Sequence, residues 1–207
     1  MGNESSTKQR IMEVALDLFS QKGVDAVGVE EIARAVGIKA PSLYKHYKNK
    51  QAIFDSIMEE MERRYEDETE RMYHHISHAE NDKANYIFID EDELVRREMK
   101  VVDYLMHDNY VSKFRKLLIV EQFRDKKFSD IYNTRHINFM VTYHKRVFIE
   151  LINAKVIKDE DPYIMSIQYM APIFELLAWN DREPEMEERT IDLIEKHIRQ
   201  FVRVYSN

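Results

Sequence analysis

The sequence contains no cysteine and little glycine or proline. Without cysteine, its 207 residues can form no disulfide, no thiolate zinc site and no cysteine nucleophile. Four glycines and four prolines are too few for the many turns of an all-β fold. Hydrophobic residues make up 44% of the chain, enough for a buried core. We therefore predict an all-α protein.

Long hydrophobic runs are also missing. No apolar run approaches the roughly 20 residues that a bilayer-spanning helix needs. The first residues, Met1 to Gln9, are polar and lack the hydrophobic core of a secretory signal. We expect a soluble, cytoplasmic protein with no membrane partner.

Motifs of common enzyme classes are absent as well. The chain has no HExxH, no Gly-rich phosphate loop, no G-x-S-x-G and none of the Glu-x-x-His pairs of di-iron bundles. His74 and His78 stand at i, i+4 and could share a metal ion, but their polar flanks favour a solvated helix end. We expect no enzyme, cofactor or metal. A catalytic site made of scattered residues stays open as an alternative.

The stretch Val29 to Lys50 reads as two short helices joined at Gly37. Apolar residues recur at helical spacing before the glycine, at Val29, Ile32, Ala33 and Val36. Gly37 can adopt the left-handed conformation that ends a helix. The second helix places Leu43 and Tyr47 on one face. The opposite face carries Pro41, Tyr44, Lys45 and Lys48.

Charge is distributed unevenly along the chain. Residues 1–50 hold eight Lys and Arg against six Asp and Glu, a net charge of +2, whereas the other residues hold 23 against 32, a net charge of −9. From Ala33 to Lys50 there are five basic residues and no acidic one. A basic helix-turn-helix on an acidic chain is suited to the DNA major groove. A helical hairpin with a solvated charged face is the alternative.

Residues 8–54 resemble the N-terminal domain of the TetR family of bacterial transcription regulators. The resemblance rests on the first-helix residues Ile11, Ala15, Leu18 and Phe19, on Gly23, Ile32, Ala33 and Gly37, and on the run Pro41-Ser42-Leu43-Tyr44-Lys45-His46-Tyr47-Lys48-Asn49-Lys50. It implies a three-helix helix-turn-helix DNA-binding domain, residues 1–52. A helical effector-binding and dimerisation domain, residues 53–207, is expected to follow.

The resemblance also implies which residues contact DNA. Phosphate contacts fall to Tyr44, His46 and Lys50, and base readout falls to Lys39, Ser42 and Lys45. Ala40 and Pro41 can touch only thymine methyl groups. Lys48 lies on the same face, and a solvated lysine is the alternative there. Gly28 is the expected cap of the helix that starts near Val29, where the family more often has Ser or Thr, so a hydroxyl contact to phosphate is lost.

Further helices are expected in the remainder of the chain. We predict a first helix after the N-cap candidates Ser5, Ser6 and Thr7, a long helix over 50–78, a loop over 79–92, and helices over 93–107, 111–123, 128–153, 162–180 and 185–205. The last two have apolar seams at 3-4 spacing: Ile164, Ile167, Ala171, Phe174 and Ala178 in one, and Ile191, Ile194, Ile198, Phe201 and Tyr205 in the other. Such seams can build a four-helix homodimer interface or can face the chain's own core.

Family members hold a small-molecule effector among the body helices, so the resemblance implies a pocket there. Glu121 and Glu175 interrupt apolar runs, and a buried carboxylate needs a partner, either an Arg or Tyr of the protein or a cationic ligand. Plain core packing is the alternative for all candidates. The predicted pocket residues are Tyr104, Phe114, Leu118, Glu121, Tyr143, Tyr169, Phe174 and Glu175.

Together, these patterns predict a DNA-binding transcription regulator, a repressor by family expectation. A homodimer would read a palindromic operator on double-stranded DNA, and an unidentified small molecule would release it. The alternatives are a regulator without an effector and a helical module that binds another protein.

Overall fold

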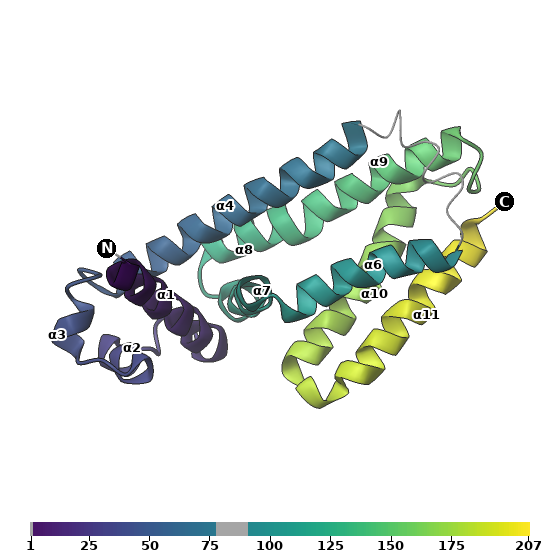
Figure 1. The fold of residues 1–207 in the computed structure, drawn as a ribbon. Helices are drawn as coiled ribbons and strands as arrows, with labels where there is room; N and C mark the ends of the chain where they lie inside the picture. Colours follow the sequence, from purple (N-terminus) through teal and green to yellow (C-terminus); the bar gives the residue numbers. More distant parts are fainter. Residues whose placement is uncertain (1, 78–90) are drawn as a thin grey trace. The chain divides into compact units, whose positions relative to one another are not determined.

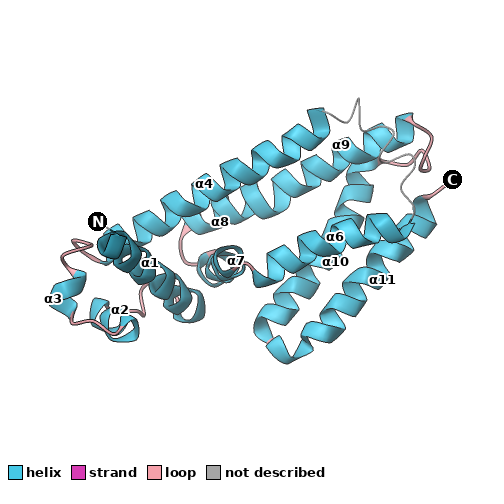
Figure 2. Ribbon diagram, viewed as in Figure 1, coloured by secondary structure: helices cyan, strands magenta, loops and turns pink. Residues whose placement is uncertain are grey.

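The computed structural model describes residues 2–77 and 91–207, which form helices joined by short loops (Figure 1, Figure 2). The helices are α1 (Gly2–Lys22), α2 (Val29–Val36), α3 (Ala40–Leu43), α4 (Lys50–Ser77), α6 (Glu91–His107), α7 (Asn109–Glu121), α8 (Lys126–Tyr132), the π-helix η1 (Asn133–Phe139), α9 (Met140–Asn153), α10 (Pro162–Arg182), the 3-10 helix η2 (Pro184–Met186) and α11 (Glu187–Tyr205). The all-α prediction is confirmed: the described residues contain no strand, only an isolated bridge between Ile157 and Ser206.

Two predicted helix starts and one predicted continuous helix are wrong. α1 begins at Gly2, before the candidate caps Ser5 to Thr7, because Ser and Thr cost little inside a helix and need not start one. α6 begins at Glu91, inside the predicted loop, because three acidic residues in its first turn favour a helix start. The predicted helix 128–153 is interrupted by η1, in which the ladder of backbone hydrogen bonds widens.

Some predictions fall on parts of the chain that cannot be compared. His78 and residues 79–90 of the predicted loop lie outside the described residues, as does the side chain of His74. Within the described residues, no helix is both long and apolar enough to cross a bilayer.

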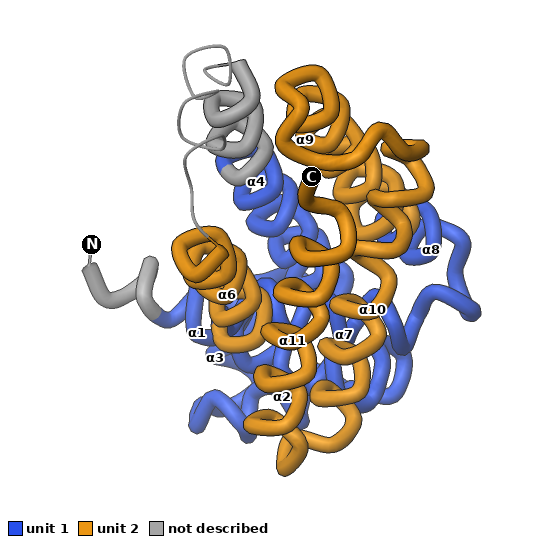
Figure 3. The backbone as a smooth tube through the Cα atoms, turned by 90° about the vertical axis from the view of Figure 1, so that its right-hand side faces the viewer, with its two compact units in different colours: residues 1–70, 108–132 blue, residues 71–107, 133–207 orange. Residues whose placement is uncertain are grey.

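The chain divides into two compact units, coloured separately in Figure 3. Unit 1 comprises residues 1–70 and 108–132, and unit 2 comprises residues 71–107 and 133–207. The predicted DNA-binding domain, residues 1–52, therefore belongs to a larger packing unit that includes α7 and α8. The functional boundary at residue 52 stays a prediction.

The core of unit 1 forms around α1, which packs against α2 and α7. The predicted stripe of α1 faces this core, since Ile11, Ala15 and Phe19 are fully buried. The rest of this core includes Tyr47, from the segment after α3, and the helix residues Ile32, Leu43, Ile53, Ile57, Phe114, Leu117 and Leu118. The helix-turn-helix thus shares one hydrophobic core with α4 and α7.

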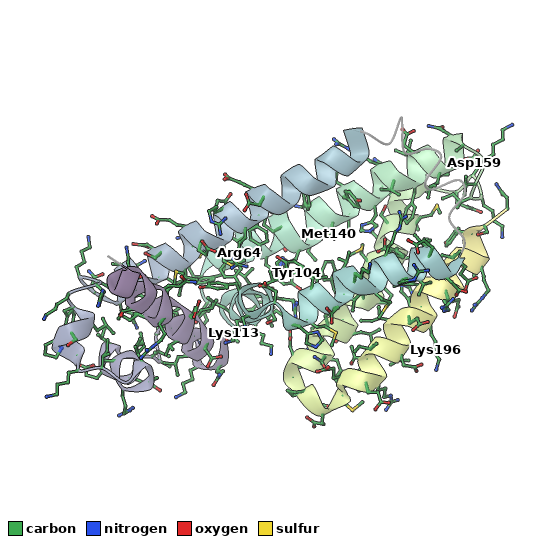
Figure 4. All side chains as sticks on the ribbon, viewed as in Figure 1. Arg64, Tyr104, Lys113, Met140, Asp159 and Lys196 are labelled. Carbon is green, nitrogen blue, oxygen red and sulfur yellow. The ribbon has the colours of Figure 1, made fainter. Side chains whose placement is uncertain are left out.

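Polar contacts also hold α4 and α7 together within unit 1. The Asp108 side chain caps α7 by accepting from the amides of Tyr110 and Val111, at 2.9 and 3.0 Å. Arg64 of α4, labelled in Figure 4, lies over the Tyr110 ring at 4.1 Å. The Tyr110 hydroxyl donates to Glu13 of α1, and burial together with this carboxylate raises the pKa of Tyr110 to about 12.

The turn between α1 and α2 is held by hydrogen bonds to the backbone amide and the backbone carbonyl of Val24. The buried Glu121 carboxylate of α7 accepts from the Val24 amide at 2.7 Å. The Lys50 ammonium at the start of α4 donates to the Val24 carbonyl at 2.8 Å. Gly23 precedes this residue with φ of +84°. We call these two contacts the Val24 clamp.

The core of unit 2 is built from α6, α9, α10 and α11. The two predicted seams differ in burial. In α10, Ile164 is 47% exposed and Ile167 38% exposed, while Met165, Tyr169 and Ile173 face the core. In α11, the seam residues Ile194, Ile198 and Phe201 are buried in unit 2 itself.

Gly23→Ala should destabilise the protein because of the Val24 clamp. A β-carbon at Gly23 would lie 2.6 Å from Oε1 of Glu121, and φ of +84° is unfavourable for alanine. We expect the free energy of unfolding to fall by about 2 kcal/mol in urea denaturation followed by circular dichroism. Gly28→Ala, at φ of −92° with 3.6 Å to its nearest neighbour, is the control and should lose less than about 1 kcal/mol. Equal losses would contradict this account.

Candidate nucleic-acid interface and effector cavity

The turn between α2 and α3 forms as the sequence predicts. Gly37 lies in the left-handed region with φ of 79°, and its amide donates to the Arg34 carbonyl at 3.1 Å. The next amide, of Ile38, donates back to the Ala33 carbonyl at 2.9 Å. Arg10 of α1 donates to the Val36 carbonyl, which leaves the end of α2 well satisfied. The turn is therefore fixed from inside unit 1.

The second helix of the motif is short. α3 covers only Ala40–Leu43, and turns continue its course to Tyr47, whose amide donates to the Leu43 carbonyl at 3.1 Å. Leu43 and Tyr47 are buried, as predicted. The Tyr47 hydroxyl donates to the Lys8 carbonyl, which attaches the second helix to α1.

Opposite these two anchors lies an exposed basic surface. Tyr44 is 49% exposed. We call this surface the basic face; its other members, all exposed, are Arg34, Lys39, Pro41, Lys45 and Lys48. Within the described residues, its lysines form no ion pair. The basic face is therefore free to meet an anionic partner.

Two predicted DNA contacts have structural roles instead of open positions. The Lys50 ammonium is engaged in the Val24 clamp, and it also reaches the Asp25 carbonyl at 3.5 Å. Ala40 packs against the unit 1 core. Ser42 and His46 are half-buried at the edge of the basic face.

The caps of α2 and α4 explain two more residues of the motif. Gly28 is the N-cap of α2 in an extended conformation, as predicted, and supplies no side-chain hydrogen bond. Asn49 caps α4 by accepting from the Ala52 amide at 2.8 Å. The two capped helices thus flank the residues of the basic face in the sequence.

Three of the predicted pocket residues belong to the interior of unit 1. Phe114 and Leu118 are fully buried in its core. Glu121 is 4% exposed and has partners within the protein, the Val24 amide and Arg124 at 3.8 Å. Its place in an apolar run correctly indicated a buried carboxylate with a partner. The nearer partner is a backbone amide, where the sequence suggested an Arg or Tyr, and Arg124 lies farther away.

Three others lie at or near the surface of unit 2. The Glu175 side chain is 76% exposed and pairs with Arg182 at 3.0 Å, so its apolar neighbours in sequence face elsewhere on α10. Tyr104, labelled in Figure 4, is 37% exposed. Phe174 is half-buried and stacks on His136 with a ring separation of 6.3 Å.

Tyr143 and Tyr169 line a cavity of about 150 Å³ inside unit 2, between α6, α9, α10 and α11. The other polar groups of this cavity include Glu98 and His144, which sequence reasoning missed. Glu98 stands in the charged stretch EDELVRREMK, where one more acid has no distinguishing pattern. Only its i, i+3 spacing to Val95, a buried residue of α6, pointed towards the core.

Comparisons with known proteins agree with this architecture. Residues 11–57 match the family model for bacterial regulatory proteins, tetR family. Over 53 residues the chain is 45% identical to the HTH-type transcriptional regulator AcrR of Shigella flexneri, a match that covers 26% of this chain and 25% of AcrR. The chain thus aligns with about a quarter of the length of the curated relatives it matches.

Solved structures extend the likeness to the whole fold. NalD of Pseudomonas aeruginosa, the secondary repressor of the MexAB-OprM multidrug efflux pump, has a TM-score of 0.63 at 19% identity, over 100% of this chain and 99% of NalD. A complex of SmeT with triclosan has a TM-score of 0.63 at 17% identity, over 98% of this chain and 92% of SmeT. SmeT represses the multidrug efflux pump SmeDEF of Stenotrophomonas maltophilia.

At such identities the solved structures show a shared fold, whereas the match over residues 11–57 identifies the helix-turn-helix itself. The turn at Gly37, the buried Leu43 and Tyr47 and the exposed basic face all lie inside the matched residues. Residues 11–57 of this chain are thus similar to the matching part of bacterial regulatory proteins of the tetR family.

Proposed function

We propose that this protein is a transcriptional repressor that binds a palindromic operator as a homodimer and is released by a small molecule. The observation that carries the proposal is the basic face, which presents lysines and Tyr44 without an acidic residue from Ala33 to Lys50. The matched relatives named as regulators or repressors support it.

On DNA, the start of the second helix would enter the major groove. Lys39, Ser42 and Lys45 are the proposed base contacts, and a lysine can donate to N7 and O6 of guanine. Tyr44, Lys48 and His46 are the proposed phosphate contacts, which set the register on the duplex. Lys50 would act mainly by positioning the motif through the Val24 clamp.

Dimerisation would use the exposed seam of α10. Its large apolar residues Ile164 and Ile167, with Tyr163 beside them at 50% exposure, form an apolar strip on a helix whose other face is buried. The seam of α11 lies in the core of unit 2, so we assign to α11 a supporting part at the interface through its outer face. Two-fold symmetry would then match the palindrome.

Release would follow from binding in the body. An effector that binds better to a form with mismatched recognition helices shifts the population towards that form and lowers DNA affinity by the same coupling. The SmeT and triclosan complex shows a small molecule bound to a protein of this fold. For the present chain we propose the unit 2 cavity as the effector site.

Tyr44→Ala and Lys45→Ala should each weaken binding to a duplex selected from a random pool. Each removes an exposed side chain of the basic face, and we expect a loss of about tenfold or more in fluorescence anisotropy. Lys196→Ala, an exposed lysine of unit 2 paired with Asp192, is the control and should bind as the parent does. Failure to select any duplex would favour a protein-binding module.

Salt dependence tests the number of phosphate contacts. A lysine held in the groove displaces a counterion from the phosphates whether its hydrogen bond goes to a base or to a phosphate. If Lys39, Lys45 and Lys48 of both protomers each displace one counterion, log affinity against log salt should have a slope of about −5. A slope near about −7 would mean that Lys50 also contacts phosphate despite the Val24 clamp. A slope close to zero would contradict the proposed interface.

Ile167→Glu should dissociate the dimer. A charge in the middle of the α10 seam would be buried without a partner, so we expect a monomer by analytical ultracentrifugation and weaker operator binding. Ile149→Glu on α9, where the residue is 36% exposed, is the matched control and should stay dimeric. A dimeric Ile167→Glu protein would exclude this interface.

A further inference from the structure

The unit 2 cavity has a distinctive set of polar groups. Among its described lining residues are two acids, Glu91 and Glu98, and neither Lys nor Arg. Glu91 is compensated from α11 by Arg199 at 3.2 Å and Arg203 at 3.4 Å. Among the described residues, Glu98 has no such cationic partner.

Glu98 has one neutral partner. Its carboxylate accepts from the Tyr169 hydroxyl at 2.9 Å, and burial raises the pKa of Glu98 above its usual range. A carboxylate with two oxygens can accept several hydrogen bonds, so this contact leaves acceptor capacity unused. The Tyr169 hydroxyl alone stabilises the ionised form of Glu98 only weakly. A cation in the cavity would stabilise it more strongly.

His144 adds a second acceptor. Its Nδ1 donates to the carbonyl of Met140, a residue labelled in Figure 4, at 2.8 Å, so Nε2 carries the lone pair. Burial lowers the pKa of His144 to about 4 and keeps the ring neutral at physiological pH. The cavity therefore presents acceptors to a ligand that can donate.

The apolar part of the cavity consists largely of aromatic rings. Tyr169 is central: its ring centroid lies 5.0 Å from that of His144, 5.9 Å from that of Phe148 and 5.0 Å from that of Phe201. Tyr143 lies 5.0 Å from His144 on the other side. Ring faces attract cations, most strongly where water is excluded.

We propose that this cavity binds a small organic ammonium ion, with the charged nitrogen at Glu98 and a short apolar body among the rings. The volume of about 150 Å³ suits a body of roughly the size of benzene, which fills an engineered cavity of similar volume. That such a ligand would release the protein from DNA rests on the proposed function. That the cavity binds an organic ammonium ion does not rest on it.

Benzylamine, which is protonated at neutral pH, and benzyl alcohol are suitable probes because they differ mainly in charge. Both are titrated into the full-length protein without DNA, by calorimetry or ligand-observed NMR. We expect benzylammonium to bind with a Kd of about 1 mM or tighter, and benzyl alcohol to bind at least about tenfold more weakly. Equal affinities, or no binding of benzylammonium, would overturn the proposal.

Glu98→Gln keeps the shape of the side chain and removes its charge. We expect benzylammonium affinity to fall about tenfold or more while benzyl alcohol binding is retained, which reports that the cavity is intact. Glu175→Gln removes an equal charge from the surface of the same unit and should leave both affinities unchanged. Unchanged benzylammonium binding by Glu98→Gln would refute the assigned contact.

The same probes separate this inference from the proposed function. If benzylammonium binds through Glu98 and DNA affinity falls, the ligand class and the release of DNA by this ligand are both supported. If it binds through Glu98 and DNA affinity is unchanged, the ligand class stands and release by this ligand does not. If DNA binding fails altogether, the titrations without DNA still decide the ligand class.

Discussion

The helix-turn-helix depends on hydrogen bonds to a single peptide segment, the one at Val24. Glu121 of α7 holds its amide and Lys50 of α4 holds its carbonyl, while Gly23 supplies the backbone conformation that lets both approach. Because α1 also packs against α2 and α7, the basic face is oriented by residues far along the chain from the motif. The basic face and α7 therefore belong to one compact unit, and a change at the end of α7 acts directly on the turn that leads into α2.

The helix-turn-helix was largely predictable, because its signals are local. A glycine that must be left-handed, two anchors four residues apart and a run without acids can each be recognised within a few residues, as at Gly37, Leu43 and Tyr47. Lys50 could not be assigned in this way. Its sequence neighbours suggest an exposed lysine, and its partner is a carbonyl 26 residues earlier, which only the folded chain brings near.

Unit 2 shows where periodicity stops being informative. The seams of α10 and α11 have the same spacing and similar residues, yet one faces outward and the other faces the core. A pattern records that a face is apolar but not what covers it. The same limit applies to acids: Glu175, in an apolar run, is exposed, while Glu98, in a charged run, borders the cavity and bonds to Tyr169. Both outcomes depend on how each helix is rotated by its neighbours.

In the Val24 clamp, two side chains, those of Glu121 and Lys50, form hydrogen bonds with main-chain atoms of Val24. Any amino acid except proline at position 24 offers the same amide and carbonyl, so the contact places almost no demand on the identity of that residue. Positions 121 and 50, by contrast, must supply an acceptor and a long donor, and position 23 must tolerate a positive φ. Substitutions in this turn should therefore accumulate at residue 24 during evolution, while its three supporting positions change only together or not at all.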